Sequence, residues 1–268
     1  MTYNDRMTLL ARLGFAARGL VYLLVGWFAL DAARQGSRPS DNQGAMATLV
    51  DAPFGKVLLA LCALGFAGYA FWRLMQAAVD PEGRSKSTRG RFERAGYAIS
   101  GITHLVLMVL AAKLALRESP ATTGAPGDES AQSWSAWLLE QPGGEALLIA
   151  AGVLLIVVAG AQAFKAYSAK FDDLSIDVPA PRYVHWIGRL GYAARAVIFA
   201  MVGWFVISAA RNNNAEEAGG LGRALRELQA QEHGAWMLGI VAVGLALFGV
   251  FSLIEARFRR VNVPKAHI

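Results

Sequence analysis

Six long apolar runs constrain this chain more than any other feature of its sequence. Each run holds about 20 residues, the length at which a helix crosses the hydrocarbon core of a bilayer. Lipid cannot hydrogen-bond free backbone groups, so such a span must be helical, and the runs do not alternate as barrel strands would. The sequence therefore predicts six transmembrane helices, at Gly14–Ala33, Phe54–Ala77, Ala95–Leu116, Gly144–Tyr167, Leu190–Ala210 and Ala235–Arg257.

Charge and composition agree with this class. Charged residues make up 17% of the 268 residues, below the roughly 25% of a soluble domain. The net charge is +6, but the basic residues cluster at the ends of apolar runs, which is typical of topology signals. We therefore expect no nucleic-acid partner. The single cysteine, Cys62, lies inside an apolar run and is expected to be a small hydrophobic residue that is either buried or lipid-facing.

The Lys and Arg residues in the short connections predict the orientation. One set of connections holds 13 of them and the other holds six, and the richer set should be cytoplasmic. Both termini are then cytoplasmic, and the acidic loop with Glu118, Asp128, Glu129 and Glu140 lies outside. Its stretch Ser119–Gly127 is typical of a flexible solvent loop. The richer set is Arg6, Arg12, Arg84, Lys86, Arg89, Arg91, Arg94, Lys170, Arg182, Arg189, Arg259, Arg260 and Lys265; the other set is Arg34, Arg38, Arg117, Arg211, Arg223 and Arg226.

The spans repeat in pairs. The segment from Arg12 to Arg18 reads Arg-Leu-Gly-Phe-Ala-Ala-Arg, and the segment from Arg189 to Arg195 reads Arg-Leu-Gly-Tyr-Ala-Ala-Arg. A weaker copy, Arg-Ala-Gly-Tyr-Ala-Ile-Ser, ends at Ser100. Charged, glycine and aromatic positions agree together, which indicates internal repetition. Before each even span, apolar residues at helical spacing predict a short amphipathic outer helix, at Ala45–Val50, Trp134–Leu139 and Leu221–Leu228.

Each unit is thus an odd span, a short outer helix and an even span, and all units share one orientation. Parallel repeats predict a pseudo-threefold axis along the membrane normal. The expected fold class is an all-α integral membrane protein with six transmembrane helices arranged as three parallel two-helix repeats around that axis. We treat residues 1–268 as a single membrane domain, with repeats at approximately 12–80, 94–170 and 189–260.

The repeated pattern resembles a bacterial membrane family catalogued as domain-of-unknown-function family 1206. The resemblance rests on Gly14-Phe15-Ala-Ala-Arg18-Gly19 with Tyr22, and on Gly68-Tyr69-Ala-Phe-Trp72-Arg73-Leu-Met-Gln76, together with their later copies. The second copy departs from it with Ser100 and His104, and the third with Ala196 and Phe199. The resemblance implies the repeat layout and a location in the bacterial inner (plasma) membrane. It implies no activity.

One face of the odd spans collects polar residues inside the apolar runs. Arg18 and Tyr22 are four residues apart and share a helix face, and Ser100 and His104 occupy the matching positions of the second copy. Arg195 matches Arg18, and Glu255 lies at a similar depth, so an ion pair between Glu255 and one of the arginines is expected. The candidate intramembrane site for an anion or a lipid is Arg18, Tyr22, Ser100, His104, Arg195 and Glu255.

Each of these residues also has a structural interpretation. The two arginines lie about one turn from the cytoplasmic edge and could extend to nearby headgroups. His104 could be a neutral histidine that is hydrogen-bonded within the bundle. Arg73, at the inner end of its span, is typical of an interfacial anchor and is given no chemistry.

The sequence predicts no enzyme, no cofactor and no metal, because no nucleophile-elbow, Walker or dinucleotide pattern occurs in the right context. Two interpretations of function remain. The first is a structural or accessory bundle that binds the lipid bilayer, with anionic lipids at the cytoplasmic face, or a membrane-protein partner. The second is a transporter or channel for a small solute or an ion, with a path along the pseudo-threefold axis. The first is favoured because it needs fewer features that the sequence does not show.

Overall fold

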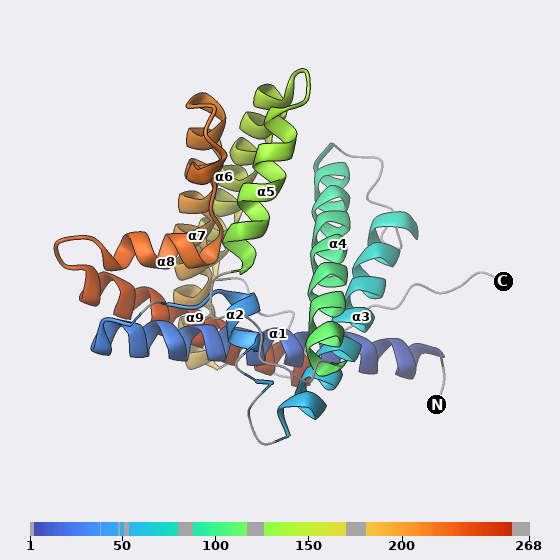
Figure 1. Cartoon of the computed structure of the whole chain (residues 1–268). Coiled ribbons are helices and arrows are strands. Elements are labelled where there is room, and N and C mark those ends of the chain that lie inside the picture. Colours follow the sequence, from blue (N-terminus) through green and yellow to red (C-terminus); the bar gives the residue numbers. More distant parts are fainter. Residues whose placement is uncertain are drawn as a thin grey trace.

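The structure, a computed structural model, describes residues 3–37, 39–47, 49–50, 54–79, 88–116, 126–169 and 181–258. All regular secondary structure in these residues is helical (Figure 1). The helices are α1 (Tyr3–Gln35), α2 (Asn42–Ala47), α3 (Gly55–Val79), α4 (Thr88–Leu116), α5 (Pro126–Leu139), α6 (Gly144–Ser168), α7 (Arg182–Arg211), η3 (Ala215–Glu217), α8 (Leu221–Gln229) and α9 (Gly234–Phe258).

Within the described residues, six helices are long and apolar enough to cross a membrane, as the sequence predicts. The protein is a multi-pass integral membrane protein. Its spans are Arg12–Gln35, Gly55–Ala78, Arg94–Leu116, Gly144–Ser168, Arg182–Arg211 and Gly234–Phe258. The even spans agree with the prediction to within a few residues. The odd-span helices begin earlier than predicted, because a helix that enters lipid keeps its backbone hydrogen bonds beyond the apolar run.

The two ends of each odd span differ. Arg12, Arg94 and Arg189 lie near the beginnings of these spans, and we call those ends the basic end. The other ends of the odd spans precede α2, α5 and α8 in the chain, and we call them the linker end. Several basic residues used for the orientation fall outside the described residues: Arg38, Arg84, Lys86, Arg117, Lys170, Arg259, Arg260 and Lys265.

The spans pack as three pairs, each joining the even span of one unit to the odd span of the next. These pairs are α3 with α4, α6 with α7, and α9 with α1, and Figure 1 shows the α1–α9 pair crossing the α6–α7 pair steeply. Small residues bring the backbones together. A Cβ atom on Gly19 would lie 2.9 Å from the carbonyl oxygen of Gly249, and one on Gly203 equally close to that of Gly152. Close packing of this kind drives helix association in lipid.

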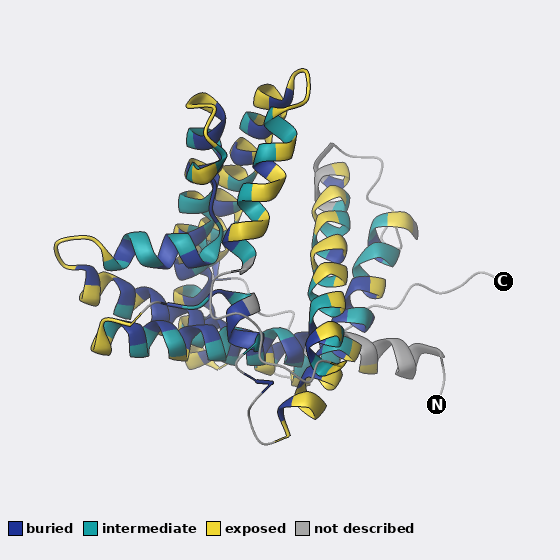
Figure 2. Cartoon of the chain, in the orientation of Figure 1, coloured by how far each residue is buried: buried dark blue, intermediate teal, exposed yellow. Residues whose placement is uncertain are grey.

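The second unit departs from threefold regularity. Within the first and third units the two spans also pack on each other, α1 on α3 and α7 on α9. In the described part of the chain, α4 and α6 do not pack along each other. They are the least buried of the six spans, and Figure 2 shows exposed residues along both.

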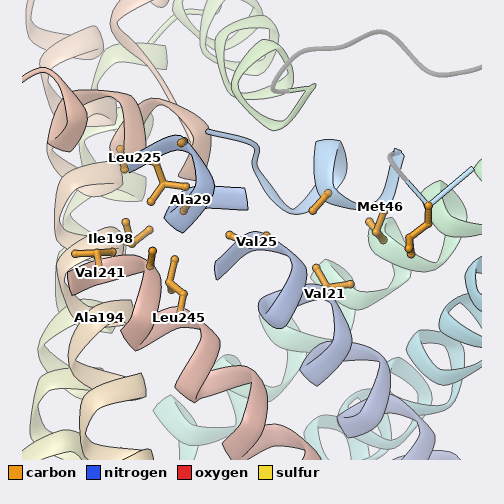
Figure 3. Packing of buried hydrophobic residues seen from close by; sticks show 14 of the residues in the cluster. Val21, Val25, Ala29, Met46, Ala194, Ile198, Leu225, Val241 and Leu245 are labelled. Carbon is orange, nitrogen blue, oxygen red and sulfur yellow. The ribbon is translucent and has the colours of Figure 1, made fainter. Parts of the chain in front are cut away.

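The largest core cluster joins α1, α7 and α9 beneath the linking helices. Figure 3 shows Val25 of α1 facing Ile198 of α7 and Leu245 of α9, with Leu225 of α8 and Met46 of α2 closing the same cluster from the linker end. Cys62 is buried in this cluster, which decides between the buried and the lipid-facing position expected for it. The amphipathic outer helices thus bury their apolar faces on the spans.

Polar contacts interlock the linking helices of successive units. Asp41, 2% exposed, accepts hydrogen bonds from the backbone N–H of Gly44, which caps α2, and from that of Gly127 in the next unit, both at 2.7 Å. Asp128 of α5 accepts from the backbone N–H of Gly220 and from Arg226 Nη2, both at 2.7 Å. Gln229 Nε2 donates to the carbonyl oxygens of Ala32 and Ser37. The three units are therefore linked in a cycle.

The predicted solvent loop, Ser119–Gly127, lies outside the described residues as far as Ala125, and it ends earlier than expected because α5 begins at Pro126. Asp128, which was expected in an acidic loop, lies on α5 and is 4% exposed. The carboxylate can be buried because both of its oxygens have partners. Arg226 neutralises its charge, and the backbone N–H of Gly220, at the start of α8, donates a hydrogen bond to it. The other two predicted outer helices, α2 and α8, lie within a few residues of the expected positions.

Candidate functional site

Arg18 is held inside the bundle at the basic end. Its Nη2 atom forms an ion pair with Glu255 of α9, and its side chain is 13% exposed against 2% for Glu255. Its Nε donates to Ser252 Oγ at 3.1 Å and its Nη1 to Tyr69 Oη at 3.5 Å. The expected ion pair with Glu255 is present, and Arg18 is the arginine that forms it. Its guanidinium points into the protein and not out to the headgroups.

Tyr69 connects Arg18 to a second arginine, Arg73. The phenol oxygen of Tyr69 also accepts hydrogen bonds from Arg73 Nε at 3.0 Å and Nη2 at 2.8 Å, while Arg73 Nη1 donates to Gln76 Oε1. The Arg73 guanidinium lies 4.6 Å from the ring centroid of Trp72. Sequence reasoning treated Arg73 as an interfacial anchor and missed its place in the cluster. Two cations therefore share one neutral acceptor.

Phe248 of α9 connects Arg18 to the third arginine, Arg195. The guanidinium of Arg18 lies 5.1 Å from the Phe248 ring centroid and that of Arg195 lies 4.4 Å from it. Arg195 also lies 5.5 Å from the ring of Tyr22. Aromatic faces attract a cation but provide no hydrogen-bond acceptor in the ring plane. The Nε atom of Arg195 is buried and has no hydrogen-bond partner among the described residues.

His104 joins the cluster from α4. Its ring lies 4.4 Å from that of Tyr69, and its Nδ1 donates to the backbone carbonyl of Ser100 at 2.7 Å. Because Tyr69 accepts hydrogen bonds from Arg18 and Arg73, this ring contact places His104 beside the group that those two arginines share. Of the predicted set, Arg18, Tyr22 and Arg195 therefore meet around Phe248, and Glu255 joins them through its ion pair with Arg18. His104 meets them through Tyr69, and Ser100 contributes its carbonyl group to His104.

The repeat explains why the charges do not balance. Counted from the glycine that begins each even span, Gln76, Lys165 and Glu255 occupy the same position. Glu255 gives Arg18 its counter-charge. The position that would serve Arg195 is Lys165 on α6, a second cation, whose Nζ lies 5.5 Å from the ring of Tyr192. The arginine cluster, which we define as Arg18, Arg73, Arg195, Tyr69, Phe248, His104 and Glu255, thus contains three guanidinium groups and one carboxylate.

Two further features bear on what the site can hold. Within the described residues, no group of three His, Cys, Asp or Glu side chains comes together to hold a metal ion. A groove of about 420 Å³ lies between α1 and α9 and is lined by apolar residues. Trp27, which lines it, is 65% exposed, so this groove faces lipid and is separate from the arginine cluster.

Three stretches of the chain, residues 13–80, 95–169 and 190–259, match the model of the family described as Domain of Unknown Function (DUF1206). The chain belongs to the DUF1206 family. The three DUF1206 matches confirm the family resemblance seen in the repeated arginine-glycine-aromatic pattern. The chain is also 32% identical over 258 residues to "Uncharacterized protein YxxB" of Bacillus subtilis (strain 168), an alignment that covers 95% of this chain and 92% of that protein. No solved structure matches it. Membership of the DUF1206 family thus accounts for the repeats and carries no activity with it.

Proposed function

We propose that this protein is a helical bundle of the bacterial inner membrane that binds a phosphate-bearing anion in the arginine cluster. The observation that carries the proposal is the excess of positive charge. Three guanidinium groups are joined through the shared rings of Tyr69 and Phe248, with Glu255 as their carboxylate, and the Nε atom of Arg195 is buried without a partner.

Physical chemistry favours an external anion at this position. A charge within a transmembrane segment is costly, and it persists where a counter-charge or water compensates it. Planar guanidinium groups bind phosphate through paired, charge-assisted hydrogen bonds. Lys165 stands where a carboxylate would neutralise Arg195, so within the described residues this repeat position does not supply a second anion.

The proposal places the cluster near the cytoplasmic face. The excess of Lys and Arg at the basic end supports this orientation by the positive-inside rule. Anionic headgroups and free phosphate compounds both occur at that depth, so either source satisfies the chemistry. The proposed role is binding without catalysis, and the protein acts as a structural or accessory component of the membrane.

A transport path along the pseudo-threefold axis receives less support. The ring of Tyr22 packs edge-on against Phe248 at 4.8 Å, and that of His104 packs against Tyr69. These contacts close the shared face of the odd spans with aromatic groups. We therefore propose a packed binding site and not a conduit.

Binding of defined anions to the delipidated protein in neutral detergent tests this proposal. Native mass spectrometry would measure the affinity for phosphatidylglycerol, with phosphatidylcholine as the neutral lipid and inorganic phosphate as the free anion. We expect phosphatidylglycerol or phosphate to bind the wild-type protein, and Arg195→Gln to weaken that binding about fivefold, the value of one arginine near a membrane surface.

Arg211→Gln is the matched control, because Arg211 lies on the same helix, is exposed and sits at the linker end. It should leave the affinity unchanged. The proposal fails if neither anion binds better than phosphatidylcholine, or if the Arg195 and Arg211 variants lose affinity equally.

A further inference from the structure

We infer that the ligand of the arginine cluster is an anionic phospholipid, which reaches the cluster sideways through an opening between α4 and α6. This inference rests on the proposed function and specifies the ligand. It starts from the one place where the bundle does not close: α1 packs on α3 and α7 on α9, whereas α4 and α6 do not pack along each other in the described residues.

Equivalent glycines show how the second unit differs from the first and the third. Gly14, Gly96 and Gly191 hold the same position in the three odd spans. A Cβ atom on Gly14 would press on Gly65 and Tyr69 of α3, and one on Gly191 would press on Phe248 of α9. A Cβ atom on Gly96 would meet nothing within 4 Å, and the same holds for Gly160 on α6. The close helix contact of the other two units is thus missing in the second.

The helices beside this opening present apolar faces. Ile102 and Val106 of α4 are 58% and 56% exposed, and Leu154 and Val157 of α6 are 47% and 62% exposed. Apolar faces of this extent within a span fit acyl chains. A free phosphate compound has no group that would occupy them.

The charge beside the opening selects the headgroup. His104 of α4 lies against the ring of Tyr69, whose phenol oxygen accepts hydrogen bonds from Arg18 and Arg73. A phosphate bound there lies at the basic end, at the level where headgroups lie, while its chains extend along α4 and α6. The combination of excess positive charge with adjoining apolar faces therefore fits a lipid that is anionic, such as phosphatidylglycerol.

Photo-crosslinking tests the route. The protein is reconstituted in phosphatidylcholine nanodiscs with a trace of phosphatidylglycerol that carries a diazirine in one acyl chain, and adducts are mapped by mass spectrometry. We expect adducts to concentrate on residues 99–109 and 150–164, and a phosphatidylcholine analogue to label all lipid-facing surfaces without this preference. Arg195→Gln should reduce these adducts about fivefold.

A double variant tests whether side chains added on α4 and α6 block the opening, and a single variant on α9 is its control. Gly96→Leu combined with Gly160→Leu adds side chains where nothing lies within 4 Å, and Gly239→Leu on α9 does the same at a site away from the opening. The first pair should lower both phosphatidylglycerol adducts and affinity, and the Gly239 variant should leave them unchanged.

The outcomes separate the two proposals. If phosphatidylglycerol binds with the expected dependence on Arg195, but its adducts are spread as those of phosphatidylcholine or gather in the α1–α9 groove, the lateral route is wrong and anion binding stands. If inorganic phosphate binds and phosphatidylglycerol does not, the ligand class is wrong. If neither binds in an Arg195-dependent manner, both proposals fall.

Discussion

Arg18 of α1 and Glu255 of α9 form an ion pair across 237 residues of sequence, and the carboxylate is almost fully buried. This contact joins the first span to the last. Glu255→Gln leaves the Arg18 guanidinium without its counter-charge inside the bundle, which we expect to cost about 3 kcal/mol of unfolding free energy. Reversible unfolding in mixed micelles would measure it.

Ser252→Ala is the control for this prediction. It removes a neutral acceptor of the same arginine and should cost about 1 kcal/mol. Equal losses from the two variants would show that the charge at Glu255 has no special role.

The glycines that begin the even spans should not tolerate a side chain. A Cβ atom on Gly144 would collide with the carbonyl oxygen of Leu138, and one on Gly234 with that of Gln229. We expect Gly144→Ala and Gly234→Ala each to destabilise the protein by about 3 kcal/mol, because backbone must move. Gly239→Ala lies in the same helix as Gly234 with open space around it, and should be neutral or slightly stabilising by thermal denaturation.

The buried carboxylate of Asp128 should hold α8 in place. Asp128→Ala leaves Arg226 and the backbone N–H of Gly220 without their acceptor, which we expect to cost about 2 kcal/mol. Hydrogen exchange should then accelerate in residues 219–229. Glu129→Ala, an exposed change at the next residue, should leave exchange in α8 as in the wild type; acceleration in both variants would refute a specific role for Asp128.

The turn after α7 should loosen in acid. Ser208 Oγ donates to Glu217 at 2.5 Å and Asn212 Nδ2 donates at 2.8 Å, and these bonds hold the pKa of Glu217 below its ordinary value of 4.5. Because the folded-state pKa is the lower one, this contribution is present above about pH 4.5 and lost as the pH falls through the folded-state pKa. Protection of residues 212–218 against hydrogen exchange, corrected for intrinsic rates, should fall over that range.

Glu217→Gln removes the titrating group and should make protection of this turn nearly independent of pH in the acid range. A pH profile identical to that of the wild type would mean that another group controls the turn.

The spans could be predicted from the sequence because lipid imposes one requirement, an apolar helix about 20 residues long. The pairing of Glu255 with an arginine also followed, since both lie at the same depth. Arg73 and Tyr69 could not be assigned in this way, because their place in the cluster depends on α3 packing against α1. A signal was nonetheless present. Counted from the glycines that begin the even spans, Gln76, Lys165 and Glu255 hold the same position, and this register shows at which repeat position a carboxylate is replaced.

Asp128 was missed for a related reason. Its partners, Gly220 and Arg226, lie more than 90 residues away, and nothing local distinguishes it from its exposed neighbour Glu129. The repeat pattern predicts three equivalent units. It therefore could not predict that α4 and α6 lack the contact that the two spans of each other unit make. Gly96 matches Gly14 and Gly191 in sequence, and only the packing shows that it has no neighbour.

The central claim is that the face shared by the odd spans is a packed binding site and not a path for water. Accessibility of single cysteines in a Cys62→Ala background tests it most directly, with a membrane-impermeant thiol reagent applied from each side of the membrane. Cysteines at Tyr22 and His104 should stay unlabelled, as should one at lipid-facing Val106, while a cysteine at exposed Arg34 should react from the outer side. Labelling at both Tyr22 and His104, with Val106 still silent, would contradict the account and indicate a hydrated pathway through the bundle.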